Sequence, residues 1–471
     1  MKYTFPETAN ITGGKIIDGT AAKDLIFDFF STDSRKDCRN SMFFPLPGEK
    51  FDSHDFIGSA IASGAKAICV AKNKLPNLNL PENISVLAVD DTLKAYQTLA
   101  NHHRRKINPK IIALTGSSGK TSAKEILKAI LVHAFGAEAV YATIGNTNNH
   151  VGVPQNLLNL TEKHGYAIIE MGTNHFGEIE VLGSIAEPDI AIIVSIGNAH
   201  LEFFKDPDGV AKEKSAIFAK LSAAGTAVIP AEGPGLGVLA DAVKKITTLR
   251  FGTDKAAPPP DVSVNYLGSS FKGSRFELAR KNCEFRRVIE WPLLGRHQAM
   301  NAAAASLAAE AAGIDLETIA DALSSGISLP GMRMNAADRD GVTWINDAYN
   351  ANPDSMRAGI EWLAEALRNE KPKGRAFVVL GDMLELGPSG PLAHRKILDL
   401  LVEKIPAAVI VTVGPIMDAA SEAIRSDTSI SIRNFQDSTE AGKYIRSKLK
   451  KDDIIYLKGS RGIALEKVLC L

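Results

Sequence analysis

The chain has 471 residues and 45% hydrophobic side chains, a length that exceeds what one hydrophobic core usually holds and that predicts about three domains. Its 54 basic and 54 acidic residues leave no excess positive charge, which argues against nucleic-acid binding. No apolar run approaches the ~18 residues of a membrane span, so we expect no stable membrane insertion.

The cysteines and the first residues indicate a reducing compartment. The four cysteines are far apart and form no C-x-x-C pair, so neither a zinc site nor a disulfide framework is predicted; they are Cys38, Cys69, Cys283 and Cys470. The N-terminal residues lack the apolar core of a signal peptide. We therefore expect a cytoplasmic protein.

The first segment, residues 1–91, is predicted to be a small α/β domain. Short apolar runs indicate strands at 26–29, 41–44, 67–70 and 85–89, with a helix at 55–63. Two polar loops, 32–35 and 47–55, lie between the strands. Loops of this composition are usually solvated turns, although binding groups also favour loops on a rigid scaffold.

An apolar strand at 111–114 leads into the main motif of the second segment, Thr-Gly-Ser-Ser-Gly-Lys-Thr at 115–121, and a helical pattern follows. Backbone N–H groups of such a turn and of the helix N-terminus converge on a polyphosphate. Lys120 supplies positive charge, and the Thr121 hydroxyl suits magnesium. Only the shorter form of the P-loop motif is present, since Leu114 stands where the longer form has glycine. A strand–turn–helix junction with chance glycines is the alternative.

Residues 92–328 are predicted to form a central P-loop domain on a parallel sheet. Apolar strands alternate with helices, which is typical of a sheet covered on both faces; strands are expected at 139–141, 166–169, 190–194 and 226–229, and helices at 92–105 and 122–131. After 258–260, three consecutive prolines, the pattern indicates an antiparallel region up to Trp291 and then an alanine-rich helix at 298–312.

Two side chains of this segment follow apolar strands, at the edge where a parallel sheet presents its ligands. Glu170 ends one strand and can reach magnesium on a phosphate held by the first strand. His200 follows the next strand along the chain. A glutamate facing water and a structural histidine are the alternatives.

Lys214 is anomalous in its predicted helix, 210–221. The apolar stripe of this helix consists of Val210, Ile217, Phe218 and Leu221. Lys214 falls on the stripe, whereas Lys212 points the other way. Burying a lysine costs free energy unless its charge is paired or removed. The alternative is a stem that snorkels at the helix edge.

Residues 329–471 are predicted to form a Rossmann-like, doubly wound domain. Strands are expected at 342–345, 376–380, 409–413 and 454–457, separated by helices. A dense polar loop, 346–355, follows the first of them. Arg333, Lys458 and Arg461 add positive charge, which a phosphoryl-transfer site needs as its negative charge redistributes. These residues could also be ordinary surface.

Ten motifs occur in order along nearly the whole chain. They are TGSSGKT at 115–121, GNTNNHVGVP at 145–154, EMGTNHFGEI at 170–179, NAHLEFF at 198–204, AKEKSAIF at 211–218, GRHQAMNAAAA at 295–305, GMRMN at 331–335, NDAYNANPDSM at 346–356, GDMLELG at 381–387 and KGSRG at 458–462. Together they resemble the Mur ligases, ATP-dependent enzymes that add amino acids to the peptide of the bacterial cell-wall precursor.

The resemblance implies an ATP site in the central domain. Nucleotide-binding residues would be Thr115, Gly116, Ser117, Ser118, Gly119, Lys120, Thr121 and Ser122 in the cradle, His297 and Asn301 near the adenine, and Arg333 and Asp347 near the ribose and phosphates. It further implies two Mg²⁺ ions held by Thr121, Glu170, His200 and Lys214. Lys214 matches a lysine that the family carbamylates. Catalytic roles would fall to Lys120, Glu170, His200 and Lys214.

The resemblance also implies a substrate site that spans domains. The UDP end would meet Thr32, Asp33, Ser34, Arg35, Gly48 and His54, and the sugar and peptide would meet Asn146, Asn148 and Asn149. Further substrate contacts would come from Tyr349, Asn350, Asn352, Ser460 and Arg461. The chain departs from the family pattern at Gly462-Ile463-Ala464, which puts peptide contacts there in doubt.

The reaction implied by the resemblance joins D-alanyl-D-alanine to UDP-N-acetylmuramoyl-tripeptide through an acyl phosphate, in a monomeric cytoplasmic enzyme. One alternative is the sibling ligase that adds the third amino acid, which usually carries a D-N-P-R type motif where this chain has Val413-Gly414-Pro415. Another is a P-loop ATPase that is not a ligase. Such an ATPase would not need the N-terminal domain and the asparagine-rich loop.

Overall fold

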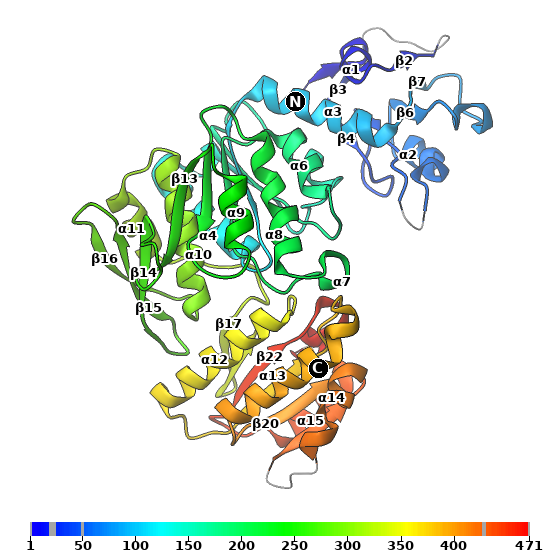
Figure 1. The fold of residues 1–471 in the computed structure, drawn as a ribbon. Helices are drawn as coiled ribbons and strands as arrows, with labels where there is room; N and C mark the ends of the chain where they lie inside the picture. The colour runs from blue at the N-terminus through cyan, green and yellow to red at the C-terminus, as the bar shows by residue number, and fades with distance from the viewer. Residues whose placement is uncertain (1, 18–24, 49–50, 426–429, 470–471) are drawn as a thin grey trace.

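The structure is a computed structural model that describes residues 2–17, 25–48, 51–425 and 430–469. Three α/β units follow one another along the chain, coloured blue, green and yellow to red in Figure 1. This arrangement confirms the predicted fold class. Cys470 and positions 49 and 50 of the predicted N-terminal loop lie outside the described residues.

A five-stranded sheet organises the N-terminal unit, in the order β2-β7-β6-β5-β4. Its strands are β2 (Lys15–Ile16), β4 (Phe29–Ser31), β5 (Ser41–Phe43), β6 (Ala67–Ala71) and β7 (Ser85–Val89); β1 (Tyr3–Thr4) pairs with β3 (Ile26–Phe27) outside it, and the helices are α1 (Phe5–Thr12) and α2 (Ile57–Ala62). The single strand predicted at 26–29 is two strands, because its halves pair with different partners. The predicted helix at 55–63 begins as a 3₁₀ turn, Ser53–Phe56.

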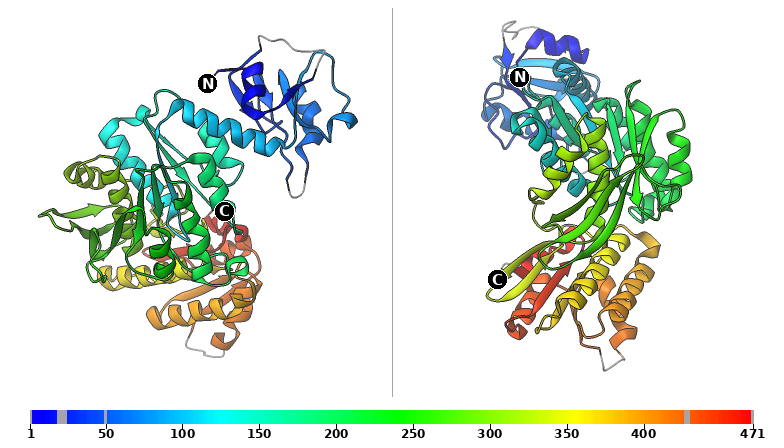
Figure 2. Two further views of the ribbon diagram at one scale, coloured as in Figure 1. Left: turned by 45° about the horizontal axis from the view of Figure 1, so that its top comes forward. Right: turned by 90° about the vertical axis from the view of Figure 1, so that its left-hand side faces the viewer.

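Helix α3 (Thr92–Ile107) joins the N-terminal unit to the central unit, as Figure 2 shows. Asp91 starts the helix by accepting a hydrogen bond from the backbone N–H of Lys94. Its buried residues share one hydrophobic core with both units. At its other end, Arg104 donates to the carbonyl oxygens of Ala186 and Glu187 at 2.8 and 2.7 Å. The two units are therefore connected by packing as well as by the chain.

A nine-stranded sheet forms the central unit, in the order β16-β15-β14-β13-β12-β11-β8-β10-β9. The strands are β8 (Lys110–Thr115), β9 (Val140–Ala142), β10 (Tyr166–Glu170), β11 (Ile190–Ile193), β12 (Thr226–Pro230), β13 (Thr247–Thr253), β14 (Val262–Ser269), β15 (Ser274–Arg280) and β16 (Arg286–Trp291). Neighbours from β9 to β14 are parallel, and β14 to β16 are antiparallel. Both the predicted parallel sheet and the predicted antiparallel region are confirmed.

Helices cover both faces of this sheet. They are α4 (Lys120–Phe135), α5 (Gly152–Leu158), α6 (Glu178–Ala186), α7 (Leu201–Phe204), α8 (Pro207–Ser215), α9 (Leu236–Ala242), α10 (Arg296–Ala311) and α11 (Leu316–Ser324). Side chains of β8 alternate: Ile112 and Leu114 join the core with α4 and α10, and Ile111 and Ala113 the core with α3, α5 and α6. The helix predicted at 210–221 is wrong in extent, because α8 tightens into a 3₁₀ turn, Ala216–Lys220.

A six-stranded sheet forms the C-terminal unit, in the order β17-β18-β22-β19-β20-β21. Its strands are β17 (Asn335–Arg339), β18 (Val342–Asn346), β19 (Ala376–Gly381), β20 (Val409–Val413), β21 (Ile432–Phe435) and β22 (Ile454–Lys458), and its helices are α12 (Pro353–Glu370), α13 (Gly390–Lys404), α14 (Pro415–Arg425) and α15 (Ser438–Lys448). All pairs except β17–β18 are parallel, and apolar clusters line both faces. The doubly wound prediction is confirmed.

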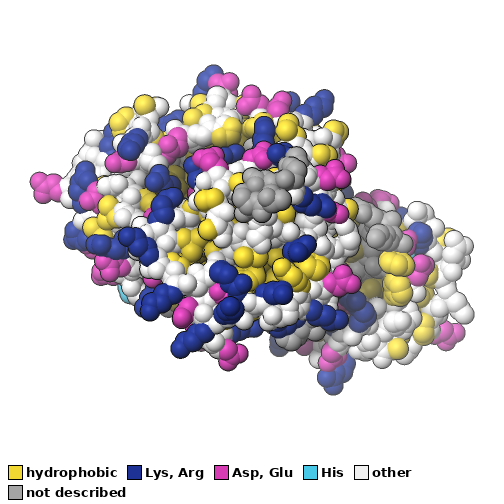
Figure 3. Space-filling view, turned by 90° about the horizontal axis from the view of Figure 1, so that it is seen from below, with side chains coloured by type: hydrophobic (Ala, Val, Ile, Leu, Met, Phe, Trp, Pro, Cys, Tyr) yellow, Lys and Arg dark blue, Asp and Glu magenta, His cyan; other side chains and the backbone are white. Residues whose placement is uncertain are grey.

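The molecular surface is mixed in charge on the face seen in Figure 3, where Lys and Arg side chains are interspersed with Asp and Glu around apolar areas. Among the described residues, no helix combines the length and the apolar character that a membrane crossing requires.

Candidate active site

The phosphate cradle lies between β8 and α4, as predicted. Gly119 has a left-handed φ of 81°, and a Cβ there would stand 2.4 Å from Asn301 Oδ1. A Cβ at Gly116 would stand 3.1 Å from the backbone nitrogen of Ser195. Side chains at these two positions would fill the turn, so glycine keeps its backbone N–H groups open to a ligand. This geometry fits a polyphosphate.

Lys120 begins α4 and folds back over the turn. Its Nζ donates to the carbonyl oxygen of Gly116 at 2.6 Å. Burial lowers the pKa of Lys120; the Glu170 carboxylate opposes this shift and the Arg333 guanidinium adds to it. The ammonium therefore lies in a pocket where a phosphate would relieve the cost of desolvation.

Glu170 ends β10 beside the cradle and is only 2% exposed. Its Oε2 accepts from the Thr121 hydroxyl at 3.0 Å, and its Oε1 accepts from Asn148 Nδ2 at 2.9 Å. The buried ammonium of Lys124 lies 3.8 Å from Oε2. From the C-terminal unit, Arg333 donates to the same Thr121 hydroxyl at 3.2 Å. The structure thus brings four predicted site residues together.

The oxygens of Thr121 and Glu170 fit one Mg²⁺ ion, which binds through one or two carboxylates plus substrate phosphates and keeps several waters. In the described ranges, no group of three or more His, Cys, Asp or Glu side chains is arranged to hold a metal ion. A magnesium ion held by Thr121 and Glu170 would therefore take its remaining ligands from phosphate and water.

Lys214 is buried at 1% exposure, as its place on the apolar stripe predicted, and Lys212 is exposed. Within the described part of the chain its ammonium forms no hydrogen bond or ion pair. Burial is the main cause that holds the pKa of Lys214 well below its ordinary value; nearby Lys120 also lowers it, and Glu213 opposes the shift. An uncharged amine is therefore favoured at this position.

Glu213, the residue before Lys214, is a buried carboxylate that the sequence analysis missed. It accepts hydrogen bonds from the backbone N–H groups of Gly177 and Ile179 at 2.7 and 2.9 Å, and from the Thr173 hydroxyl at 3.1 Å. It therefore fixes the start of α6. Its partners are distant in sequence, so the helical pattern around it carries no signal of this role.

His200 contacts the C-terminal unit. It has a left-handed φ of 54° at the start of α7, and its Nδ1 is 2.8 Å from Oε2 of Glu385 in the C-terminal unit. No hydrogen bond or ion pair among the described residues joins it to Thr121 or Glu170. Its metal role stays a prediction.

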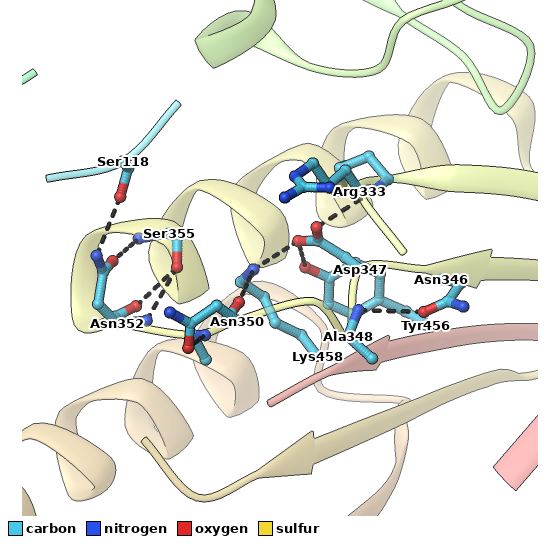
Figure 4. A network of polar contacts seen from close by, with 12 residues as sticks. Ser118, Arg333, Asn346, Asp347, Ala348, Asn350, Asn352, Ser355, Tyr456 and Lys458 are labelled. Atoms are coloured by element: carbon cyan, nitrogen blue, oxygen red, sulfur yellow. Dashed lines mark hydrogen bonds and ion pairs between the residues drawn. The ribbon is translucent and has the colours of Figure 1, made fainter. Parts of the chain in front are cut away.

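A network in the C-terminal unit surrounds Asp347 (Figure 4). Asp347 Oδ2 accepts from Lys458 Nζ at 2.7 Å and from the Tyr456 hydroxyl at 3.2 Å, and Oδ1 accepts from the Met334 backbone N–H at 3.2 Å. The Arg333 guanidinium lies 3.5 Å from the centre of the Tyr349 ring. The Tyr349 ring thus supports Arg333, which contacts Thr121 of the P-loop, and Asp347 fixes Lys458 within the C-terminal unit.

The polar loop before α12 contacts the P-loop directly. Asn352 caps α12 by accepting from the Ser355 backbone N–H at 2.8 Å, and its Nδ2 donates to the Ser118 hydroxyl at 3.0 Å (Figure 4). The carbonyl oxygen of Asn350 accepts from Lys458 Nζ at 3.2 Å. The Asn352 side chain, predicted to bind substrate, therefore links the two units.

A cavity of about 460 Å³ lies between the central and C-terminal units, beside these contacts. It is lined by Thr121, Lys124, Glu125, Gly145, Asn146, Pro330, Gly331, Met332, Arg333, Tyr349 and Arg461. Asn146, Tyr349 and Arg461 were predicted to bind substrate, and the structure places all three on this cavity. Arg461 also pairs with Glu466 at 2.8 Å. Predicted Ser460 accepts from the Leu384 backbone N–H at 2.9 Å.

The predicted adenine side lies on α10. Asn301 donates to Gln298 Oε1 at 2.9 Å beside Gly119. Burial lowers the pKa of His297 to about 4; Asp347 opposes the shift and Lys458 adds to it. His297 is therefore a neutral imidazole that faces the C-terminal network.

The predicted UDP loops lie in the N-terminal unit. Arg35 pairs with Asp33 through two hydrogen bonds of 2.8 and 2.9 Å, which lower the pKa of Asp33 to about 2. His54 is buried; its Nδ1 is 2.6 Å from Asp52 Oδ1, and its Nε2 accepts from the Ala71 backbone N–H at 3.2 Å. Both ring nitrogens are thus engaged, so His54 orders its loop.

Other predicted residues in these regions are placed as follows. The Gly48 backbone N–H donates to the carbonyl oxygen of Phe51 at 2.9 Å. Thr32 and Ser34 are half-buried in the loop before β5. Asn149 Oδ1 accepts from the backbone N–H of Gly152 at 2.8 Å and so begins α5. Substrate binding by these residues stays a prediction.

A glycine-rich cradle, a threonine–glutamate pair for magnesium and a second α/β unit whose arginine contacts that threonine define a multidomain P-loop enzyme with its site between domains. The chain belongs to the Mur ligase family. The Mur ligase middle domain matches residues 114–309, and the Mur ligase glutamate ligase domain matches residues 332–461.

Relatives of known function match over the whole chain. UDP-N-acetylmuramoyl-tripeptide–D-alanyl-D-alanine ligase of Bacillus subtilis is 33% identical, over 100% of this chain and 98% of its own. The crystal structure of MurF from Acinetobacter baumannii has a TM-score of 0.88 and 30% identity, covering 100% of this chain and 98% of that one. MurF from Thermotoga maritima in complex with ADP has a TM-score of 0.79 and 25% identity, covering 94% and 96%.

Proposed function

We propose that this protein is the ATP-dependent ligase that joins D-alanyl-D-alanine to UDP-N-acetylmuramoyl-tripeptide, giving the pentapeptide precursor of peptidoglycan, ADP and phosphate. The relatives that match end to end carry this activity in their names. We place the reaction in the cytoplasm, where the nucleotide precursor and ATP are both available. Among the described residues, no helix could span a membrane.

One observation carries the proposal: the cavity between the units has the P-loop helix on one side and Arg333 and Arg461 on the other. A carboxylate is a poor acceptor for an amine and must first be activated, so a ligase has to hold an acid beside the phosphate that will be transferred. The two arginines on the opposite wall of the cavity can bind the substrate carboxylate and stabilise the negative charge that develops during phosphoryl transfer.

The residues of the chain have distinct tasks in this reaction. Lys120 and the open N–H groups of the cradle hold the phosphates of ATP. Arg333, fixed by stacking on Tyr349, orients the terminal carboxylate of the tripeptide as it accepts the phosphoryl group. The amine of D-alanyl-D-alanine then attacks the acyl phosphate and phosphate leaves. The cavity between the units would hold this mixed anhydride beside the phosphate cradle.

Thr121 and Glu170 would hold magnesium, which supplies charge neutralisation for phosphoryl transfer. We assign a second magnesium to a carbamate on Lys214. Its uncharged amine is the form that reacts with carbon dioxide, and the resulting anion would remove the problem of a buried, unpaired ammonium. His200 would complete this second site.

Measuring phosphate release by the protein tests the function directly. Phosphate should appear only when ATP, magnesium, the UDP-tripeptide and D-alanyl-D-alanine are all present. Omitting each component in turn is the control, and a parallel reaction offers the UDP-dipeptide with single amino acids. Comparable release in the parallel reaction would assign the sibling activity, and release with ATP alone would indicate an ATPase.

A further inference from the structure

Asp354 lies in the first turn of α12, two residues after the Asn352 cap, and reaches into the central unit. Its Oδ2 accepts from the backbone N–H of Asn198 at 2.7 Å, and its Oδ1 accepts from Asn198 Nδ2 at 3.2 Å. The fit is close at Gly197, where a Cβ would stand 2.4 Å from Asp354 Oδ2. A carboxylate at a helix N-terminus is also stabilised by the helix dipole.

The segment that Asp354 grips, residues 195–198, forms one wall of the phosphate cradle. The Ser195 hydroxyl accepts from the Ser118 backbone N–H at 2.9 Å and donates to the Ser118 carbonyl oxygen at 2.9 Å. The Gly197 backbone N–H donates to the Ser117 hydroxyl at 3.0 Å. A shift of this segment would therefore move two residues of the cradle.

The contact crosses two units, so it forms only when the C-terminal unit is docked. Asn352 makes a parallel contact with Ser118 from the same helix turn. Asp354 makes the tighter contact, since it is charged and accepts two hydrogen bonds from one residue. Neither the P-loop motif nor the predicted ligand set includes Asp354 or Gly197.

We propose that Asp354 is a positioning residue that sets the wall of the phosphate cradle when the C-terminal unit docks. It acts through Gly197 and Asn198 and does not touch substrate. This inference rests on the proposed ligase reaction, because its effect is read as turnover. Lys120 and the turn assigned to the phosphates belong to the central unit, so loss of the contact should slow phosphoryl transfer more than it weakens ATP binding.

The first test is Asp354→Ala with Glu361→Gln as control, an exposed carboxylate on the same helix. Loss of charge-assisted hydrogen bonds should lower kcat about tenfold or more. The affinity for ATP, measured by calorimetry, should fall by a smaller factor than kcat. Asp354→Asn keeps one acceptor oxygen and should lie between the parent and Asp354→Ala. A fall in ATP affinity that matches the fall in kcat would overturn the proposal.

The second test uses the close fit at Gly197. Its φ is outside the left-handed region, and the three atoms nearest to a Cβ all belong to Asp354, the third at 3.9 Å. Gly197→Ala should therefore lower kcat in the parent and have little further effect in Asp354→Ala, where the space is free. Equal losses in both backgrounds would refute the mechanism. A parent that releases no phosphate would instead contradict the proposed function.

Discussion

Lys214 shows how burial decides the chemistry open to a side chain. The amphipathic pattern of its helix predicted a lysine on the apolar face, and the structure confirms one with no hydrogen-bond partner among the described residues. An ammonium in that position is unfavourable, and its lowered pKa expresses this cost. The proposed carbamate would change the sign of the charge and would offer magnesium a further oxygen ligand.

Lys214→Ala should therefore lose at least about tenfold in activity, the scale on which groups that support a metal site act. Short-chain carboxylates added to the assay should restore part of the loss by supplying the missing anion. Lys212→Ala is the matched control, because Lys212 is exposed on the same helix. This variant should behave as the parent. Parental activity in Lys214→Ala would contradict the carbamate.

His297 makes stability depend on pH in a defined direction. Burial lowers its pKa from 6.5 to about 4, so between these values the unfolded chain binds a proton that the folded chain does not. Stability is therefore lost as the pH falls from 6.5 toward 4, by up to about 3 kcal/mol. His297→Gln should lose less stability than the parent between pH 7 and 4.5 in urea titrations. Parallel curves for the two proteins would show that another group is responsible.

The position and burial of site residues were predictable where a local sequence pattern records them. The stripe around Lys214 and the glycine-rich turn are such patterns, and the turn also located Thr121. Glu213 and Asp354 were missed because their partners are backbone N–H groups far away in sequence, which no periodicity encodes. A polar loop in the sequence indicates that its side chains make contacts. Only the folded structure shows which residues they contact.

At the scale of elements, α12 is held by the central unit at two places. Its first turn contacts the P-loop through Asn352, and its later turns meet the β14–β15 hairpin. There the Trp362 indole N–H donates to the Ser269 hydroxyl at 2.9 Å, and the Ser269 backbone N–H donates to Glu365 Oε1 at 3.0 Å. Phe271 packs edge-on against Trp362. The antiparallel part of the central sheet thus packs against α12 and helps to hold the C-terminal unit in place.

Removing the contact between Trp362 and Ser269 should weaken the attachment of the C-terminal unit to the central unit. Trp362→Phe keeps an aromatic ring but loses the buried hydrogen bond, and should lower the calorimetric unfolding midpoint by about 2–4 °C. Ser269→Ala leaves the indole N–H unpaired and should have a similar effect. The double variant should lose less than the sum of the two single variants, because both changes remove the same Trp362–Ser269 hydrogen bond. Fully additive shifts would refute this contact.

Strand and helix types were predictable in both larger units because long apolar runs alternate with amphipathic ones. The strands β1, β2, β13, β17 and β21 were missed. β1 and β2 have only two residues, and the other three mix polar with apolar side chains and so form no apolar run. The β13–β14 pairing, which fuses the parallel and antiparallel regions into one sheet, is a tertiary contact and has no local signal.

At the scale of the whole molecule, the residues predicted to bind the two nucleotides lie in different units. The predicted UDP loops belong to the five-stranded sheet, and the phosphate cradle belongs to the nine-stranded sheet, with α3 between them (Figure 2). The Arg35 side chain is 87% exposed at its loop, whereas Lys120 is folded into the cradle. The two sites are therefore built from separate sets of residues.

Lys120→Ala should abolish turnover and ATP binding while leaving the affinity for the UDP-tripeptide largely intact, because it removes a charge that only the cradle uses. Arg35→Ala is the reverse variant: it should weaken binding of the UDP-tripeptide, since a cation on the predicted UDP loop is lost, and leave ATP affinity unchanged. Calorimetry with each ligand separately measures all four values. If Lys120→Ala loses affinity for the UDP-tripeptide as completely as for ATP, the two ligands share one site and the division of labour between the units is wrong.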